Sequence, residues 1–125
     1  MDKISNKYNL EDRTTRFGEE IIIFCSSLKQ DAVSKPLISQ LVRSGTSIGA
    51  NYAEANGGSS RRDFQNKIYI CKKEAQETLH WLRIIQKYFS DKELQVRELS
   101  QEVSEHILIF GKILSSLKKS EGNKY

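Results

Sequence analysis

The tetrapeptide ETLH, Glu77 to His80, has the residue types of a metal site. A Glu followed three positions later by a His is the ligand pair that di-iron proteins place on each of two helices of a four-helix bundle. Those sites need a second such pair, and here Glu102 and His106 are four positions apart. The apolar spacing around the motif also turns His80 away from the predicted core. We therefore expect no metal and no other cofactor.

The segment GGSSRR, residues 57–62, is the second candidate for chemistry. Glycines that precede a helix cradle phosphates in P-loop proteins, and a helix N-terminus attracts anions in any case. The segment lacks the G-x-x-x-x-G-K-[ST] pattern and follows no predicted strand. No Ser/His/Asp or Cys/His set lies on neighbouring rigid elements. We therefore expect a protein that is not an enzyme.

A basic helix face is the clearest indication of a ligand. Residues 60–90 carry seven basic and three acidic side chains, an excess equal to the whole net charge of +4. At helical spacing, cations and rings share the outward face of this segment. Its members are Arg62, Tyr69, Lys73, His80, Arg83 and Lys87, with Lys72 beside them. Such a face suits a phosphate backbone and unstacked bases, whereas the alternative is an ordinary solvated helix face.

A second apolar patch lies beside the core stripe of the same helix. It consists of Ile70, Trp81, Ile84 and Tyr88. A helix in a single bundle needs only one apolar stripe, about 100° wide. An additional patch with Trp and Tyr is typical of a subunit interface, because aromatic residues are enriched there. The alternative is a wide core stripe with a partly solvated Trp.

Four predicted helices position these residues, at about 10–29, 36–56, 61–89 and 92–118. Phe17, Ile21, Phe24 and Leu28 share one face of the first helix, and the fourth has a similar stripe that includes His106 or Ile107. Pro36 fits a first helical turn, Gly57 and Gly58 can end a helix, and Ser60 with Asp63 reads as a capping pair. Short connections make neighbouring helices antiparallel. We predict an all-α, up-down-up-down four-helix bundle, one domain over residues 1–125.

Composition and apolar runs fit a cytoplasmic protein without a membrane anchor. The longest apolar run, Ile21 to Cys25, is too short to span a bilayer, and no signal-type segment lies near the start. Cys25 and Cys71 fall on apolar helix faces, and no CxxC pair is present. Both cysteines are therefore expected to be buried and unpaired.

The second predicted helix has little charge. Between Pro36 and Ser59 only Arg43 and Glu54 are charged, and Gly45 and Gly49 lie on an apolar side. Each helical glycine costs about 1 kcal/mol relative to alanine. The two glycines therefore predict that another helix packs closely against this side.

The central part of the chain, residues 37–90, resembles the signature of 23S rRNA intervening sequence proteins, a bacterial four-helix-bundle family. The residues that carry the resemblance are Arg43, Ser44, Ser47, Ile48, Ala50, Asn51, Ala53, Glu54, Ser60, Asp63, Phe64, Ala75, Glu77, Thr78, Trp81 and Leu82. Asn56 stands where the family usually has Gly or Gln. The flanking helices match only in length and periodicity.

This resemblance implies a bundle that assembles as a ring, typically a pentamer, and a link to intervening sequences in large-subunit rRNA genes. A related branch, the accessory variability determinant proteins of diversity-generating retroelements, works with a reverse transcriptase and nucleic acid. The family offers no catalytic residue to carry over. We therefore expect a homo-oligomer that binds RNA or DNA, and the alternative is a scaffold for a protein partner.

The polar signature residues Arg43, Ser47, Asn51 and Glu54 share the outer side of the second helix. Arg43 and Glu54 are about 16 Å apart along the axis, at about 1.5 Å per residue. We therefore expect each to bond to another helix or chain, and not to each other. Simple exposure to solvent is the alternative.

Overall fold

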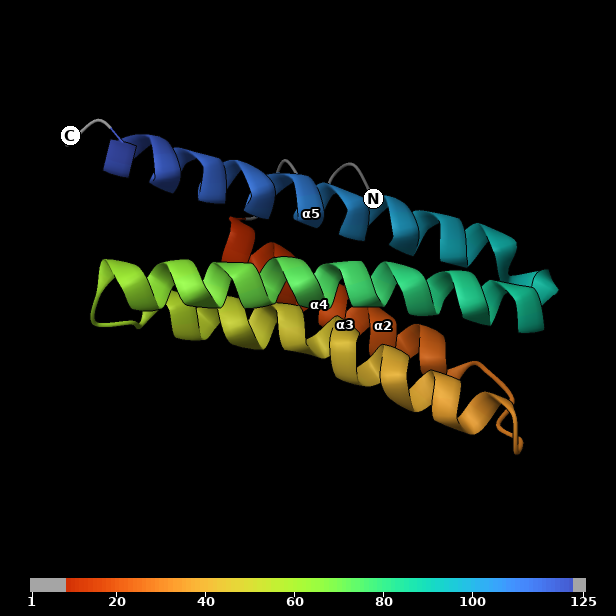
Figure 1. The fold of residues 1–125 in the computed structure, drawn as a ribbon. Coiled ribbons are helices and arrows are strands. Elements are labelled where there is room, and N and C mark those ends of the chain that lie inside the picture. Colours follow the sequence, from red (N-terminus) through yellow and green to blue (C-terminus); the bar gives the residue numbers. More distant parts are fainter. Residues whose placement is uncertain (1–8, 123–125) are drawn as a thin grey trace.

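The computed structural model describes residues 9–122, and this part of the chain is all-α, as predicted. Its long helices are α2 (Leu10–Ser26), α3 (Ser34–Asn56), α4 (Arg61–Tyr88) and α5 (Glu93–Gly122), and a short 3-10 turn, η1 (Ser90–Lys92), precedes α5. Consecutive helices run antiparallel (Figure 1). Among residues 9–122, none of the helices combines the length and the hydropathy of a membrane-spanning segment.

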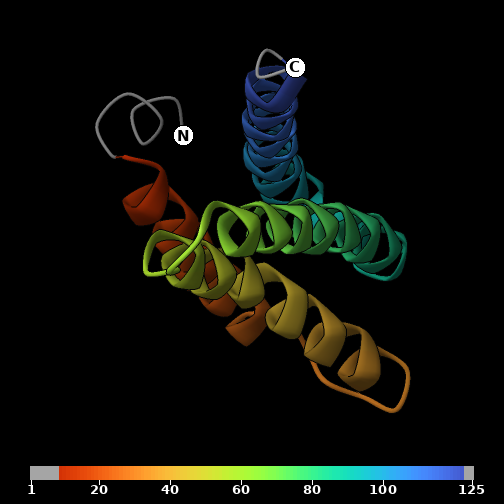
Figure 2. The ribbon, with the colours of Figure 1, turned by 60° about the vertical axis from the view of Figure 1, so that its left-hand side comes forward.

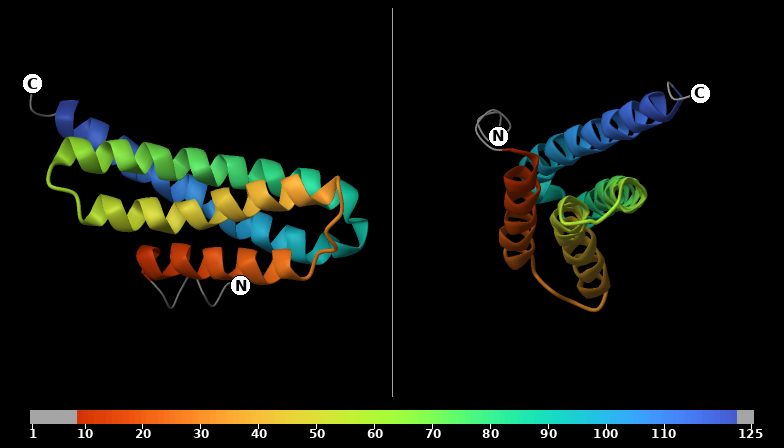
Figure 3. Two further views of the ribbon diagram at one scale, coloured as in Figure 1. Left: turned by 90° about the horizontal axis from the view of Figure 1, so that it is seen from below. Right: turned by 90° about the vertical axis from the view of Figure 1, so that its left-hand side faces the viewer.

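Helix α5 crosses the other helices diagonally. Helix α3 lies between α2 and α4, whereas α5 packs mainly on α4 and touches α2 over a short length (Figures 2 and 3). The first half of α5 meets α2, where Arg13 bonds to Glu102. Near the end of α5, the long side chain of Arg61 in α4 donates to the Leu117 carbonyl at 3.0 Å. The outward face of α4 is therefore bordered by the end of α5.

The helix starts are fixed by side-chain caps. The Asn9 carboxamide oxygen accepts from the Asp12 amide at 2.8 Å, and the Ser60 hydroxyl accepts from the Asp63 amide at 3.0 Å. The second of these caps was predicted from the sequence. Because each cap satisfies an amide that has no partner inside its helix, it sets the residue at which the helix begins.

The connection between α2 and α3 differs from the prediction at both ends. Helix α2 ends at Ser26 and not near Lys29, because the Ser27 hydroxyl and amide both bind the Phe24 carbonyl, at 2.6 and 3.0 Å. Helix α3 begins at Ser34, before Pro36, because the Asp31 carboxylate accepts from the Ser34 amide at 2.8 Å. The spacing of apolar residues does not predict these local side-chain hydrogen bonds.

The predicted apolar stripes form the core. Phe17 and Ile21 of α2 are fully buried, and in α5 His106 is completely buried whereas Ile107 is half-buried. The sequence left the choice between these two positions open. Cys25 and Cys71 are buried and unpaired, as predicted, and burial raises the pKa of their thiols to about 11 and about 12.

Helices α2 and α3 pack closely at Gly45 and Gly49, as the two glycines predicted. A Cβ on Gly45 would lie 2.9 Å from Cγ1 of Ile21, and a Cβ on Gly49 would lie 3.2 Å from the backbone of Thr14. Neither position has room for a side chain. The small side of α3 is thus covered by α2 of the same chain, and its polar side faces outward and toward α4.

Candidate nucleic-acid interface

The basic face predicted on α4 lies on the side of the helix away from the core. We call it the basic stripe, with the members Arg62, Tyr69, Lys72, Lys73, His80, Arg83 and Lys87. All are exposed except Lys72, which is half-buried. The buried residues of α4, such as Ile68, Cys71 and Ala75, occupy the opposite side. The structure therefore brings the predicted stripe residues together on one accessible surface.

The acidic residues of α4 point elsewhere. Arg43 of α3 donates to both Glu74 and Glu77, each at 3.1 Å, and Asp63 lies in the first turn, where Ser59 donates to it at 3.3 Å. The cation Lys67 is also engaged, because it pairs with Glu54 at 2.6 Å.

The cations of the stripe have no such partners. Within residues 9–122, none of Arg62, Lys72, Lys73, Arg83 and Lys87 forms an ion pair. Their positive charges are therefore directed at solvent and can be neutralised by an anionic ligand.

The two rings of the stripe have different surroundings. Tyr69 is 43% exposed, and the ammonium group of Lys118 in α5 lies 6.0 Å from the centre of its ring. His80 packs edge-on against Trp81 with ring centres 4.9 Å apart. The sequence analysis did not predict the contact from Lys118, because it ended the fourth helix at that residue. The angle at which α5 crosses α4 also has no signal in the local sequence.

The apolar patch of Ile70, Trp81, Ile84 and Tyr88 lies on the α3 side of α4. Ile70, Ile84 and Tyr88 are exposed, whereas Trp81 is half-buried and packs against the core. The Tyr88 hydroxyl donates to Asp31 at 2.6 Å, which lowers the pKa of the Asp31 carboxyl and raises the pKa of the tyrosine. The patch thus combines three accessible side chains with one that also stabilises the bundle.

The polar signature residues form a seam between α3 and α4. Besides the bonds of Arg43 and Glu54 to α4, the Ser47 hydroxyl donates to the Arg43 carbonyl at 2.6 Å. The Asn51 carboxamide donates in turn to the Ser47 carbonyl at 2.9 Å. Arg43 and Glu54 each bond to another helix and not to each other, which confirms the expectation from their axial separation. Glu77 is one of the partners of Arg43, so it does not share a site with His80.

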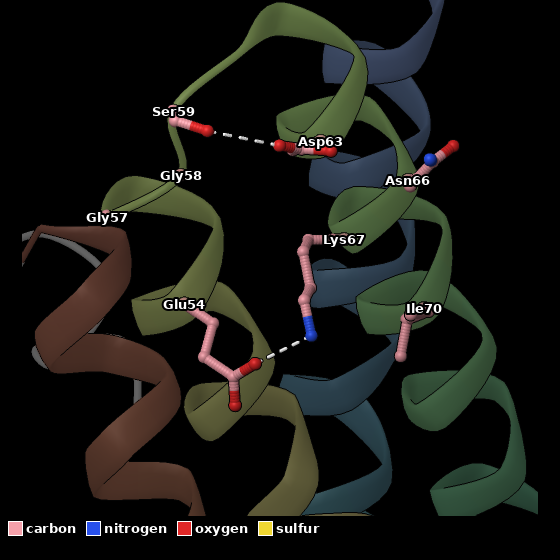
Figure 4. A pocket seen from close by; sticks show the side chains of 8 residues that line it. All are labelled: Glu54, Gly57, Gly58, Ser59, Asp63, Asn66, Lys67 and Ile70. Carbon is pink, nitrogen blue, oxygen red and sulfur yellow. Dashed lines mark hydrogen bonds and ion pairs between the residues drawn. The ribbon is translucent and has the colours of Figure 1, made fainter.

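A hollow on the described surface lies at the α3–α4 hairpin (Figure 4). It has a volume of about 690 Å³, and its lining residues are Glu54, Gly57, Gly58, Ser59, Asp63, Asn66, Lys67 and Ile70. The Glu54–Lys67 ion pair spans its middle, and Ser59 bonds to Asp63 at its rim (Figure 4). Each of its charged groups bonds to another residue of the hollow, and it is not part of the basic stripe.

A buried charged cluster between α2 and α5 was missed by the sequence analysis. Arg13 donates from Nε to Glu102 at 2.7 Å and from Nη2 to Glu105 at 2.6 Å, and Glu102 also bonds to Nε2 of His106 at 2.9 Å. The ring of Phe17 packs edge-on against His106. Among residues 9–122, no group of three or more His, Cys, Asp or Glu side chains is placed to hold a metal ion. Because the bonds of Arg13 run from α2 to two residues of α5, the cluster links these two helices.

The fold and its outward basic stripe define the protein as an all-α bundle with a cationic surface. Residues 6–112 match the model of the 23S rRNA-intervening sequence protein family, and the chain belongs to this family.

This chain is similar to a solved structure over nearly the whole length of the solved chain. It is a crystal structure of a protein of unknown function from the S23 ribosomal protein family of Bacteroides thetaiotaomicron. The identity is 30%, the TM-score is 0.76, and the match covers 85% of this chain and 98% of the other. No curated protein matches the sequence.

Proposed function

We propose that this chain is a non-enzymatic homo-oligomer that binds RNA or DNA through the basic stripe of α4. The observation that carries the proposal is the set of stripe cations without acidic partners. Arg62, Lys73, Arg83 and Lys87, which we call the phosphate set, hold backbone phosphates. The interaction is mostly electrostatic and only weakly selective for sequence, because phosphate contacts carry no base information.

The accessible side chains of the apolar patch support assembly into an oligomer. Ile70 and Ile84 are 37% and 38% exposed, and Tyr88 is 44% exposed. Aromatic and apolar side chains of this kind form the buried centre of subunit interfaces. The family resemblance implies a ring, typically a pentamer. In such a ring, several copies of the stripe act on one nucleic acid, so that weak contacts add up.

RNA and DNA binding at two salt concentrations, with mass measured by light scattering on the same sample, tests this function. We expect a mass of several protomers and an affinity that falls steeply as salt increases, because phosphate contacts release counterions. An oligomer that binds neither RNA nor DNA at low salt would overturn the nucleic-acid assignment. A monomer that binds RNA or DNA would overturn the proposal of a homo-oligomer and leave the basic stripe as the functional surface.

The second candidate function is a scaffold that binds a protein partner, and the apolar patch also favours it. Three exposed apolar side chains on one helix form a suitable contact surface for another protein. An oligomer without nucleic-acid affinity, whose patch is accessible, is the result that this alternative predicts.

A further inference from the structure

Tyr69 lies at the centre of a group of lysines that come from two helices. Lys72 and Lys73 follow it at three and four positions, and side chains at these spacings are neighbours on a helix surface. Lys118 reaches the same ring from α5, with its ammonium group 6.0 Å from the ring centre. The exposed ring thus has one ammonium group over it and two lysines beside it on the helix surface, and no acidic side chain pairs with any of these lysines in the described range.

The packing of the bundle does not explain why Tyr69 has an aromatic side chain at this position. Tyr69 is 43% exposed, and its hydroxyl makes no hydrogen bond within residues 9–122. The contact with Lys118 contributes only about 0.5–1 kcal/mol at an exposed site. A ring in this position retains a large accessible surface that is not used by the fold.

His80, the other ring of the stripe, is a poorer platform. It packs edge-on against Trp81 with an interplanar angle of 70°, so part of its surface is already covered. Its neighbour at three positions toward the N-terminus is Glu77, which would repel a phosphate even though Arg43 binds it. The sequence offered Tyr69 and His80 equally, and the structure favours Tyr69.

We infer that Tyr69 is a stacking platform for an unpaired base, with Lys72, Lys73 and Lys118 on the phosphates that flank it. The inference rests on the proposed function and narrows its ligand to a single-stranded segment of nucleic acid. In a duplex, both faces of each base are covered by neighbouring bases, so a surface ring cannot reach them. Unpaired bases are free to stack on aromatic side chains, and stacking tolerates any base.

The same geometry adds α5 to the interface. Helix α5 crosses α4 diagonally (Figure 3). Near the end of α5, Arg61 of α4 donates to the Leu117 carbonyl, and the neighbouring Lys118 reaches Tyr69. Lys118 thus has the role of a phosphate ligand from a second helix. It also orients the ring when no ligand is bound, through the cation–π contact.

Fluorescence anisotropy of the full chain tests the inference with two probes. The first is a labelled oligouridylate, and the second is the same strand paired with its complement. We expect Tyr69→Ala to weaken binding of the single strand about 5- to 150-fold, from the range measured for one stacked base. Binding of the duplex should change less than about twofold, which is within the small effects expected where no stacking is lost.

Two further variants separate stacking from structure. Tyr69→Phe keeps the ring and should bind the single strand like the unaltered chain. Lys118→Ala should make the plot of log affinity against log salt shallower by about 0.7 for each protomer that contacts the strand, the value for one phosphate contact to a single strand. Lys29→Ala, a change of the same type at an exposed site near the end of α2, should leave it unchanged. Circular dichroism of each variant verifies that the helices are intact.

The failure of this inference differs from the failure of the proposed function. If the unaltered chain binds neither probe, the proposed function itself is wrong. If it binds both and Tyr69→Ala has no effect on the single strand, or weakens both probes equally, the stripe binds nucleic acid but Tyr69 is not a stacking platform.

Discussion

Arg13 of α2 and Glu102 of α5 form a buried ion pair at the place where the first and last described helices meet. The distance from Nε to Oε2 is 2.7 Å, and the two side chains are 8% and 4% exposed. The pair lies within the short length over which α2 and α5 touch. Its charges are stabilising only while both partners are present, since a single buried charge is costly.

Replacing Arg13 with Met should therefore lower the free energy of unfolding by about 3–5 kcal/mol, measured by urea denaturation at neutral pH. The substitution leaves the Glu102 carboxylate buried without its cation. Adding Glu102→Gln to the same chain removes that charge and keeps an acceptor for His106. The double variant should be more stable than Arg13→Met alone, and a lower stability would show that the two residues are not coupled.

Stability should also fall in acid through Glu102. Burial is the largest single influence on this carboxyl and raises its pKa, but the bonds from His106 and Arg13 together outweigh it and lower the pKa from 4.5 to about 2. The unfolded chain therefore takes up a proton at higher pH than the folded chain. The stabilisation is complete above about pH 5 and is lost as pH falls from there toward 2, by up to about 3 kcal/mol.

Urea denaturation between pH 6 and 3 measures this loss at fixed protein concentration. Glu102→Gln, which cannot titrate, should be less stable at neutral pH but show a flatter profile. Parallel profiles for the two chains would contradict the assignment of acid sensitivity to Glu102.

The burial of Arg13 shows which contacts could be predicted from the sequence and which could not. Apolar stripes such as Phe17 and Ile21 identify buried faces because they repeat at helical spacing. Arg13 lies among Glu11, Asp12 and Arg16, and charged residues in such a group are normally solvated. Its partner is 89 positions away, and only the diagonal path of α5 brings the two together. Contacts that depend on helix tilt, including Lys118 over Tyr69, have no local signal in the sequence.

The close packing of α2 on α3 gives a paired prediction for two helical glycines. In Gly49→Ala the new Cβ would lie 3.2 Å from the Thr14 backbone, which cannot move without shifting α2. We expect a loss of about 1–3 kcal/mol in the free energy of unfolding, in spite of alanine's better helix propensity. Gly111→Ala in α5 meets nothing within 4 Å and should gain up to about 1 kcal/mol. A stabilising Gly49→Ala would show that the helices can separate at little cost.

The phosphate set gives a prediction on salt dependence. Replacing all four members with Ala should make the plot of log affinity against log salt shallower by about three for each protomer that contacts a single strand. At 0.1 M salt the affinity should fall by up to about 10²–10³-fold. A matched control removes four cations outside the stripe, namely Lys29, Lys35, Lys92 and Arg97. Equal losses in both variants would mean that net charge, and not the stripe, determines binding.

The apolar patch gives a prediction on assembly, and the choice of residue decides what it tests. Trp81→Asp introduces a charge at a half-buried side chain that packs against the core, so a loss of mass could follow from damage to the fold. Ile84 is 38% exposed, and Ile84→Asp places a charge on the patch without removing a buried group. We expect this variant to lose mass in light scattering while its helical content by circular dichroism stays unchanged, because a charge is costly in an apolar interface.

Leu94→Asp provides the matched control, since Leu94 is 69% exposed and lies at the start of α5, outside the patch. It should leave the mass unchanged. Trp81→Asp then completes the comparison: loss of mass with intact helices assigns Trp81 to the subunit seam, and loss of helical content assigns it to the core. If neither Ile84→Asp nor Trp81→Asp alters the mass of a folded protein, the patch is not where the subunits meet, and its exposed side chains would instead be the surface that a protein partner contacts.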